Sequence, residues 1–199
     1  MSLNKLSLFL GMPLKVSICA LHSDELIYGI KDHSHEHQSL QLSDHFGDVL
    51  TRHQLVNESA ELNQIGDLIG VDIFPLYEMC YFWDEDDKAK QLSLYQTQSE
   101  KEAELSLIEE MNRMLAKNID IVYATVVFLE SKLKGIDHLD EQLVNSNDSL
   151  INYQTYFRRS ENESAMNFFT DIGKIKGFIQ QAKALELDTF YFKMEENFH

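Results

Sequence analysis

The sequence predicts a single α+β domain over residues 1–199, with a mixed or mainly antiparallel sheet packed by about four to five helices. Apolar and polar residues alternate near both ends of the chain, which is typical of half-buried strands. Between these ends, apolar residues recur at helical spacing in several segments. A chain of 199 residues buries roughly 70% of its unfolded surface, so one core can stabilise these elements without a disulfide or metal.

An N-terminal meander of antiparallel strands is expected first. From Leu14 to Ala20 the even-numbered residues are apolar, and the odd-numbered residues between them point to the other face. Residues 6–10 and 25–30 are predicted as neighbouring strands, with turns at 11–13 and 22–24. The polar, histidine-rich residues 31–45 are predicted as a loop.

Two helices are expected next. Ser43-Asp44 is predicted to cap the first, which carries Phe46 and Val49 on its apolar side. Asn57-Glu58-Ser59 is predicted to cap the second, which ends at Gly70 because glycine favours the left-handed conformation after a helix.

The most apolar and aromatic run of the chain, Val71 to Trp83, is predicted as a central strand. Both of its faces are apolar, as in strands that are buried in the middle of a sheet. Pro75 then lies at the beginning of that strand, where a missing N–H group does least harm. Residues 84–87 are expected to turn, and residues 91–95 to run back as a hairpin partner.

Three further helices and a final strand complete the predicted fold. Ser99 and Glu102 form a capping box before a helix whose apolar stripe runs from Leu107 to Leu115. Residues 119–134 are rich in β-branched side chains, yet their apolar residues repeat at helical spacing, so a buried helix is favoured over a strand. Residues 164–182 predict another helix. Residues 189–194 alternate as a strand, and strands at both ends are expected to meet in one sheet.

The charge of the chain limits its partners. Seventeen basic and thirty-three acidic residues give a net charge of −16. This charge argues against nucleic acid, which needs a basic surface, and against anionic membranes. The only two cysteines, Cys19 and Cys80, are expected to be buried thiols in a reducing compartment. Residues 5–14 resemble the start of a signal peptide, but Lys15 interrupts the apolar run, so a cytoplasmic location is predicted.

The histidine-rich segment is the candidate metal site. His33, His35 and His37 follow a predicted strand, and His-x-His pairs in such a position can bind zinc. Alternate residues of an extended chain lie about 6.6 Å apart on one face, so two imidazoles can share an ion while a third ligand must come from elsewhere. The spacing matches no familiar hydrolase motif. A solvated polar loop is therefore the favoured interpretation, and zinc is the alternative cofactor.

The acidic and aromatic segment after the predicted central strand is the candidate partner-binding site. It contains Tyr81, Trp83, Asp84, Glu85, Asp86 and Asp87. Carboxylates beside exposed aromatic rings suit docking to a cationic protein surface. A solvated turn is the simpler interpretation of the same residues.

No catalytic residue is assigned, because the chain lacks a nucleophile elbow, a phosphate loop, a dinucleotide fingerprint and a His-Glu-x-x-His motif. The favoured hypothesis is a non-enzymatic acidic domain without a cofactor that binds a basic partner protein. Immunity proteins and antitoxins neutralise a toxin or nuclease in this way. The alternatives are a metal-dependent hydrolase that uses the His33, His35 and His37 cluster, and a structural or regulatory subunit. The sequence does not predict the oligomeric state.

Overall fold

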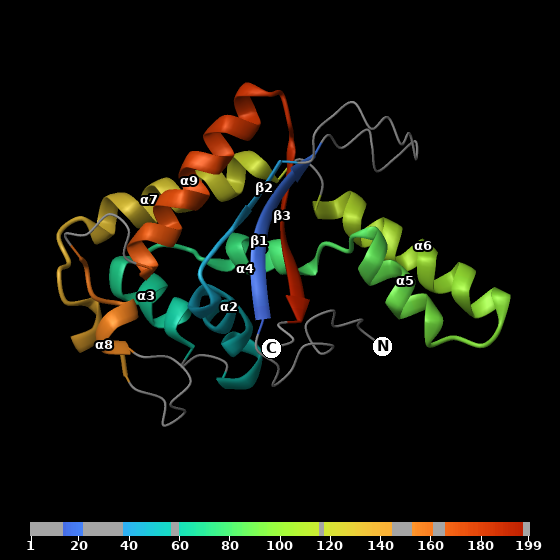
Figure 1. The fold of residues 1–199 in the computed structure, drawn as a ribbon, viewed down its shortest axis with the longest axis horizontal. Coiled ribbons are helices and arrows are strands. Elements are labelled where there is room, and N and C mark those ends of the chain that lie inside the picture. Colours follow the sequence, from blue (N-terminus) through green and yellow to red (C-terminus); the bar gives the residue numbers. More distant parts are fainter. Residues whose placement is uncertain are drawn as a thin grey trace.

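A computed structural model describes residues 14–21, 38–56, 60–115, 118–144, 153–160 and 166–196. Three antiparallel strands, β1 (Leu14–Leu21), β2 (Gln38–Gln41) and β3 (Thr189–Glu196), form a sheet in the order β2-β1-β3 (Figure 1). Helices in the described part are α2 (Asp44–Val56), α3 (Glu61–Ile69), α4 (Phe74–Glu78), α5 (Glu85–Ser93), α6 (Gln98–Leu115), α7 (Ile119–Leu133), α8 (Tyr153–Tyr156) and α9 (Phe168–Ala184), with 3-10 helices η3 (Met79–Tyr81) and η4 (Leu139–Glu141). The α+β class is confirmed.

Pairing between the two ends of the chain builds the sheet. Strand β1 pairs with β3 along its whole length, from Leu14 opposite Glu196 to Leu21 opposite Thr189. The expectation that strands at both ends meet in one sheet is therefore confirmed. The second neighbour of β1 is β2, which lies in a segment predicted as loop. The other predicted meander strands, residues 6–10 and 25–30, lie outside the described residues.

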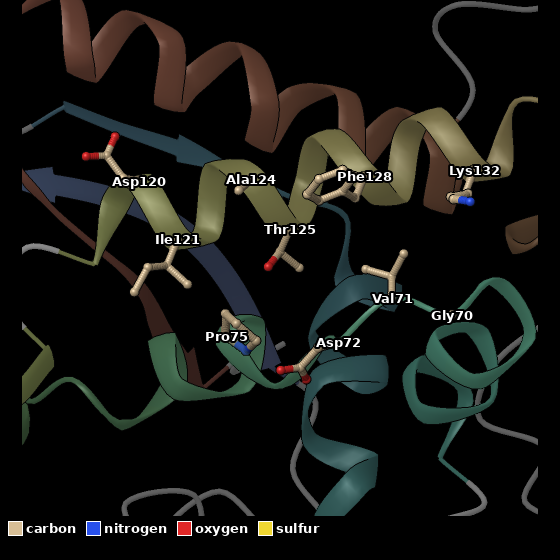
Figure 2. Close-up of a pocket in the computed structure, with 10 residues that line it drawn as sticks. All are labelled: Gly70, Val71, Asp72, Pro75, Asp120, Ile121, Ala124, Thr125, Phe128 and Lys132. Atoms are coloured by element: carbon tan, nitrogen blue, oxygen red, sulfur yellow. The ribbon is translucent and has the colours of Figure 1, made fainter.

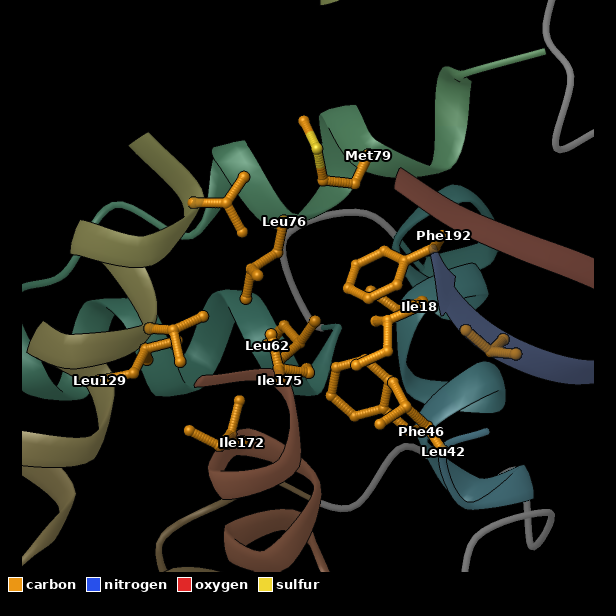
Figure 3. Close-up of a cluster of buried hydrophobic side chains, with 14 of the residues drawn as sticks. Ile18, Leu42, Phe46, Leu62, Leu76, Met79, Leu129, Ile172, Ile175 and Phe192 are labelled. Atoms are coloured by element: carbon orange, nitrogen blue, oxygen red, sulfur yellow. The ribbon is translucent and has the colours of Figure 1, made fainter. Parts of the chain in front are cut away.

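The sheet has two buried faces of different size. Val16 and Ile18 of β1 join Phe192 of β3 on the face that packs against α2 and α9, within the main hydrophobic core (Figure 3). The ring centroids of Phe46 and Phe192 lie 5.8 Å apart in an edge-to-face arrangement, which is favourable for aromatic pairs. On the opposite face Cys19 belongs to a smaller cluster of four buried residues.

All five predicted helices are present, as α2, α3, α6, α7 and α9. Helix α3 ends as expected at Gly70, which adopts a φ of 66°. The ambiguous segment 119–134 is helix α7, whose buried side includes Val122, Val126 and Leu129. The capping box of α6 lies two residues before the predicted one: the Thr97 N–H donates to Glu100 Oε2 at 3.0 Å, and the Glu100 N–H donates to Thr97 Oγ1 at 3.3 Å.

The predicted central aromatic strand is wrong, because residues 74–81 form helix α4 and the 3-10 helix η3. Pro75 lies in the first turn of α4, where its fixed φ suits a helix and its missing N–H costs nothing. The side chain of Asp72 supports this start, accepting a 3.0 Å hydrogen bond from the Phe74 N–H. Residues 91–95, predicted as the hairpin partner, belong to the end of helix α5 and the residues that follow it.

A buried polar network joins segments that are far apart in the sequence. Asp171, fully buried in the first turn of α9, accepts hydrogen bonds from the Ser43 N–H at 3.2 Å and from the Tyr156 hydroxyl at 3.0 Å. The Ser43 hydroxyl donates to the same carboxylate. Burial, followed by the charge of Asp171, raises the pKa of Tyr156 well above its ordinary value, so this hydroxyl remains a donor. A buried ion pair of 3.0 Å between Arg52 and Glu61 links α2 to α3.

The structure bears on two predictions, one about the cysteines and one about membrane crossing. Cys19 and Cys80 are buried thiols, as predicted, and burial raises the pKa of Cys19 to about 11. None of the helices in the described ranges combines the length and the apolar character that crossing a membrane requires.

Gly66 provides a test of how closely the chain folds back after α3. A Cβ atom at this position would lie 2.8 Å from the Val71 carbonyl oxygen and 3.1 Å from Ile73 Cγ1. We therefore expect Gly66→Ala to lower the free energy of unfolding by about 1–2 kcal/mol, since overpacking outweighs the gain in helix propensity. Urea denaturation measures this change.

The matched control is Gly173→Ala in α9, where an added Cβ meets nothing within 4 Å. This variant should gain up to about 1 kcal/mol from helix propensity alone. Equal stabilisation of both variants would contradict the close approach at Gly66.

Candidate protein-binding site

The acidic segment predicted as a binding site begins helix α5. The side chain of Asp84 caps the helix by accepting a 2.9 Å hydrogen bond from the Asp87 N–H. Glu85, Asp86 and Asp87 occupy the first turn, where the helix dipole favours negative charge. The run of four carboxylates thus has a local structural role, and the segment continues as a helix after Asp84.

Some of the predicted binding residues are buried and others are exposed. Trp83 is 1% exposed and Asp87 is also buried, whereas Tyr81 and Asp84 are half-buried. Glu85 and Asp86 are exposed. The indole of Trp83 is therefore unavailable to a partner in this conformation, and the solvent-facing part of the segment is its carboxylates. The role of these residues in binding stays a prediction.

Lys193 of β3 neutralises part of the negative charge of this acidic segment. Its ammonium nitrogen lies 3.2 Å from Asp86 and 3.5 Å from Asp84, and a further 3.5 Å contact joins it to Glu195. Burial acts to lower the pKa of Lys193, but the neighbouring carboxylates outweigh burial and raise this pKa well above its ordinary value. Lys193 is thus protonated at neutral pH, and it links β3 to the start of α5.

Hydrogen bonds contribute to the attachment of helix α6. The backbone N–H of Trp83 donates to Asn112 Oδ1 at 2.9 Å, and Asn112 Nδ2 donates to the Trp83 carbonyl at 2.7 Å. Gln91 of α5 donates to the buried carboxylate of Glu104 at 2.8 Å. The buried residues of α6 are Glu104, Ile108 and Asn112, a single line along the helix. Two of these three side chains are polar, so hydrogen bonds help to fix the position of α6.

The apolar stripe predicted for α6 is only partly buried. Leu115 packs against the cluster that contains Phe82 and Tyr191. Ile108 is buried, but Leu107 is 51% exposed and Met114 is 79% exposed. Met111, between them on the helix surface, is half-buried. We call Leu107, Met111 and Met114 the α6 stripe. Helices α5 and α6 form a hairpin, residues 85–115, which projects on the side of the sheet opposite α7 and α9 (Figure 1).

Carboxylates outnumber basic groups on the hairpin that carries the α6 stripe. Residues 85–115 contain eight acidic and four basic side chains. Glu110 is exposed beside the stripe, three residues after Leu107 and four before Met114, whereas Glu109 lies on the opposite side of the helix. Glu100 and Glu102 are exposed nearer the start of α6. The hairpin thus presents exposed apolar side chains bordered by negative charge. Methionine side chains adapt their shape readily, which makes them frequent at binding surfaces.

The histidine cluster lies outside the described residues, so the structure does not place His33, His35 or His37. Among the residues that are described, no group of three histidine, cysteine, aspartate or glutamate side chains is arranged to hold a metal ion. The zinc alternative therefore stays a prediction.

The two hydrogen bonds between the Asn112 side chain and the Trp83 backbone can be tested directly. We expect Asn112→Ala to lower the free energy of unfolding by about 2–4 kcal/mol, because it leaves the buried N–H and carbonyl groups of Trp83 unsatisfied. Hydrogen exchange at the Trp83 amide should become faster. Arg113→Ala, at the next and exposed position, is the control and should change both measurements little. An Asn112→Ala protein with unchanged stability would contradict a stabilising role for these two hydrogen bonds.

Comparisons with protein-family models, with curated proteins and with solved structures returned no match. The functional interpretation of this chain is therefore carried by the geometry and the charge of the α5–α6 hairpin.

Proposed function

We propose that this chain is a non-enzymatic acidic protein-binding domain that docks a basic partner protein through the α5–α6 hairpin. The observation that carries the proposal is the α6 stripe, in which Leu107 and Met114 are exposed on a helix rich in carboxylates. Apolar side chains that gather on an exposed surface and are rimmed by polar residues are typical of interaction sites.

The two parts of this surface have different roles in binding. Covering Leu107 and Met114 removes apolar area from water and supplies affinity. Lysine and arginine side chains of the partner face Glu100 and Glu110, which orients the complex and disfavours partners of like charge. The net charge of −16 attracts a cationic protein over a longer distance and accelerates encounter, an effect that salt weakens.

The partner class follows from this chemistry. Enzymes that bind nucleic acid carry cationic surfaces that hold phosphates. An acidic hairpin with an apolar stripe can cover such a surface, as a neutralising protein for a toxin or nuclease must do. The proposed function is therefore that of an immunity-protein-like or antitoxin-like inhibitor in the cytoplasm, acting by occlusion and without a cofactor.

The α6 stripe is tested by shortening its exposed side chains. Affinity capture from the native host at low salt provides the partner, and calorimetry with the purified partner measures the dissociation constant. We expect the double variant Leu107→Ser/Met114→Ser to bind about 100-fold more weakly, since each exposed anchor contributes about 1–2 kcal/mol. A captured partner that is acidic, or whose binding is unaffected by the double variant, would refute the proposal.

The matched control for this experiment is Met166→Ser/Leu185→Ser. These two apolar side chains are similarly exposed but lie away from the hairpin. Their loss should leave the dissociation constant within about twofold, because they contact no residue of the proposed surface.

A second prediction separates the local charge of the hairpin from the charge of the whole chain. Glu110→Lys should slow association with the basic partner about threefold at low salt. Asp137→Lys changes the net charge equally at an exposed position outside the hairpin, so its effect should be much smaller. Stopped-flow measurements at two salt concentrations give both rates. Equal effects of the two variants would show that the hairpin has no special role.

A further inference from the structure

Helix α7 has a second exposed apolar surface, on the side of the sheet opposite the hairpin. A groove of about 670 Å³ runs between α7 and the connection from α3 to α4 (Figure 2). Ile121, Ala124 and Phe128 of α7 form one wall, and Pro75 lies on the other. Ile121 is 58% exposed and Phe128 is 60% exposed, so both present most of their surface to solvent.

This surface carries charges of both signs. The residues that line the groove include two acidic side chains, Asp72 and Asp120, and one basic side chain, Lys132. An acidic and a basic residue therefore lie on the same helix surface, and a second copy of this chain offers the matching pair.

The order of residues along α7 is self-complementary. Asp120, Ala124, Phe128 and Lys132 follow one another at intervals of four, which places them in one ridge on the helix surface. All four line the groove, with Asp120 near one end and Lys132 near the other (Figure 2). Reversing the ridge about Val126 exchanges Asp120 with Lys132 and Ala124 with Phe128. An acidic residue then meets a basic one, and a small side chain meets a large one.

We propose that two copies of this chain associate through α7, with the two helices antiparallel about a two-fold axis that crosses the exposed side of α7 between Ala124 and Phe128. In the commonest class of helix crossing, ridges at intervals of four on the two helices lie parallel and pack into each other's grooves, which is the arrangement proposed here. Each Phe128 packs into the space above Ala124 of the second copy, and each Asp120 faces Lys132 of the second copy. The two-fold axis makes every contact occur twice.

The neighbouring groups support this register. The carboxylate of Asp120 also accepts a hydrogen bond from Lys183 of α9, which fixes its position at the end of the ridge. Lys132 has no ion pair within the part of the chain that the structure describes, and it is exposed. Buried residues Val122, Val126 and Leu129 hold the opposite side of α7 in the core, so the ridge is presented on a fixed helix.

A charge-exchange experiment tests the proposal. Asp120→Lys places lysines opposite each other at both ends of the homodimer, and Lys132→Asp places aspartates there. Each variant should dimerise at least about tenfold more weakly than the wild type in sedimentation velocity, because like charges face each other twice. An equimolar mixture of the two variants restores opposite charges at both ends of the heterodimer, and its dimer fraction should return to near the wild-type level.

The apolar part of the interface is tested by Phe128→Glu, with Leu94→Glu as control. Leu94 is similarly exposed but lies at the end of α5, on the hairpin. We expect Phe128→Glu to sediment as a single chain of 23.1 kDa and Leu94→Glu to remain dimeric. The circular dichroism of every variant should match the wild type, which confirms that the chains are folded.

Four outcomes would overturn the proposal. The first is a wild type that is monomeric at about 100 µM, a concentration at which interfaces of moderate affinity are occupied. The second is a mixture of the two charge variants whose dimer fraction does not recover. The third is a dimeric Phe128→Glu protein, and the fourth is a dimer that Leu94→Glu disrupts. The mixture also guards against misfolding, since two damaged chains would not regain association when they are combined.

Discussion

The pairing of β1 with β3 is the interaction on which the remaining structure depends. These strands lie near opposite ends of the chain, yet they pair over eight residues, with Ile18 opposite Phe192 at the centre. This register assigns every side chain of both strands to a face, because a shift by one residue would exchange the faces. One face meets α2 and α9 in the main core, and the other carries Cys19 and Tyr191 toward the segment that leads to α5.

The outer face of the sheet determines where the hairpin begins. Tyr191 stacks on Phe82 with ring centroids 4.3 Å apart, and Lys193 holds Asp84 and Asp86. The base of the hairpin is thus attached to β3, and Asn112 continues the attachment through two hydrogen bonds. Leu115 adds an apolar contact with the same cluster as Tyr191 and Phe82. These contacts hold α6 in place while Leu107 and Met114 stay exposed.

The sequence predicts best those elements whose hydrophobic pattern has a clear period. The alternation around Val16 identifies β1, and the repeat that includes Val122 and Val126 identifies α7 despite its β-branched residues. The run from Val71 to Trp83 is apolar and aromatic on both faces, which favours a buried strand, and Pro75 fits the start of a strand as well as the first turn of a helix. The burial of α6 could not be predicted for a different reason. Its buried line includes Glu104 and Asn112, whose partners are a glutamine side chain and a backbone segment, and hydrophobic periodicity detects neither.

Charge is segregated between the two exposed apolar surfaces, and this has a consequence for how they act together. The hairpin carries a surplus of carboxylates, whereas α7 and α9 are nearly balanced, so the same solvent conditions affect the two surfaces differently. In the proposed complex, association through the hairpin should weaken as salt screens its carboxylates, and the proposed α7 dimer should weaken less, because its two Asp120–Lys132 contacts accompany an apolar contact. Because α7 and the hairpin lie on opposite sides of the sheet (Figure 1), a dimer formed through α7 should leave both hairpins uncovered. Such a dimer presents two acidic hairpins to one oligomeric partner, and the second contact then forms at a high effective concentration.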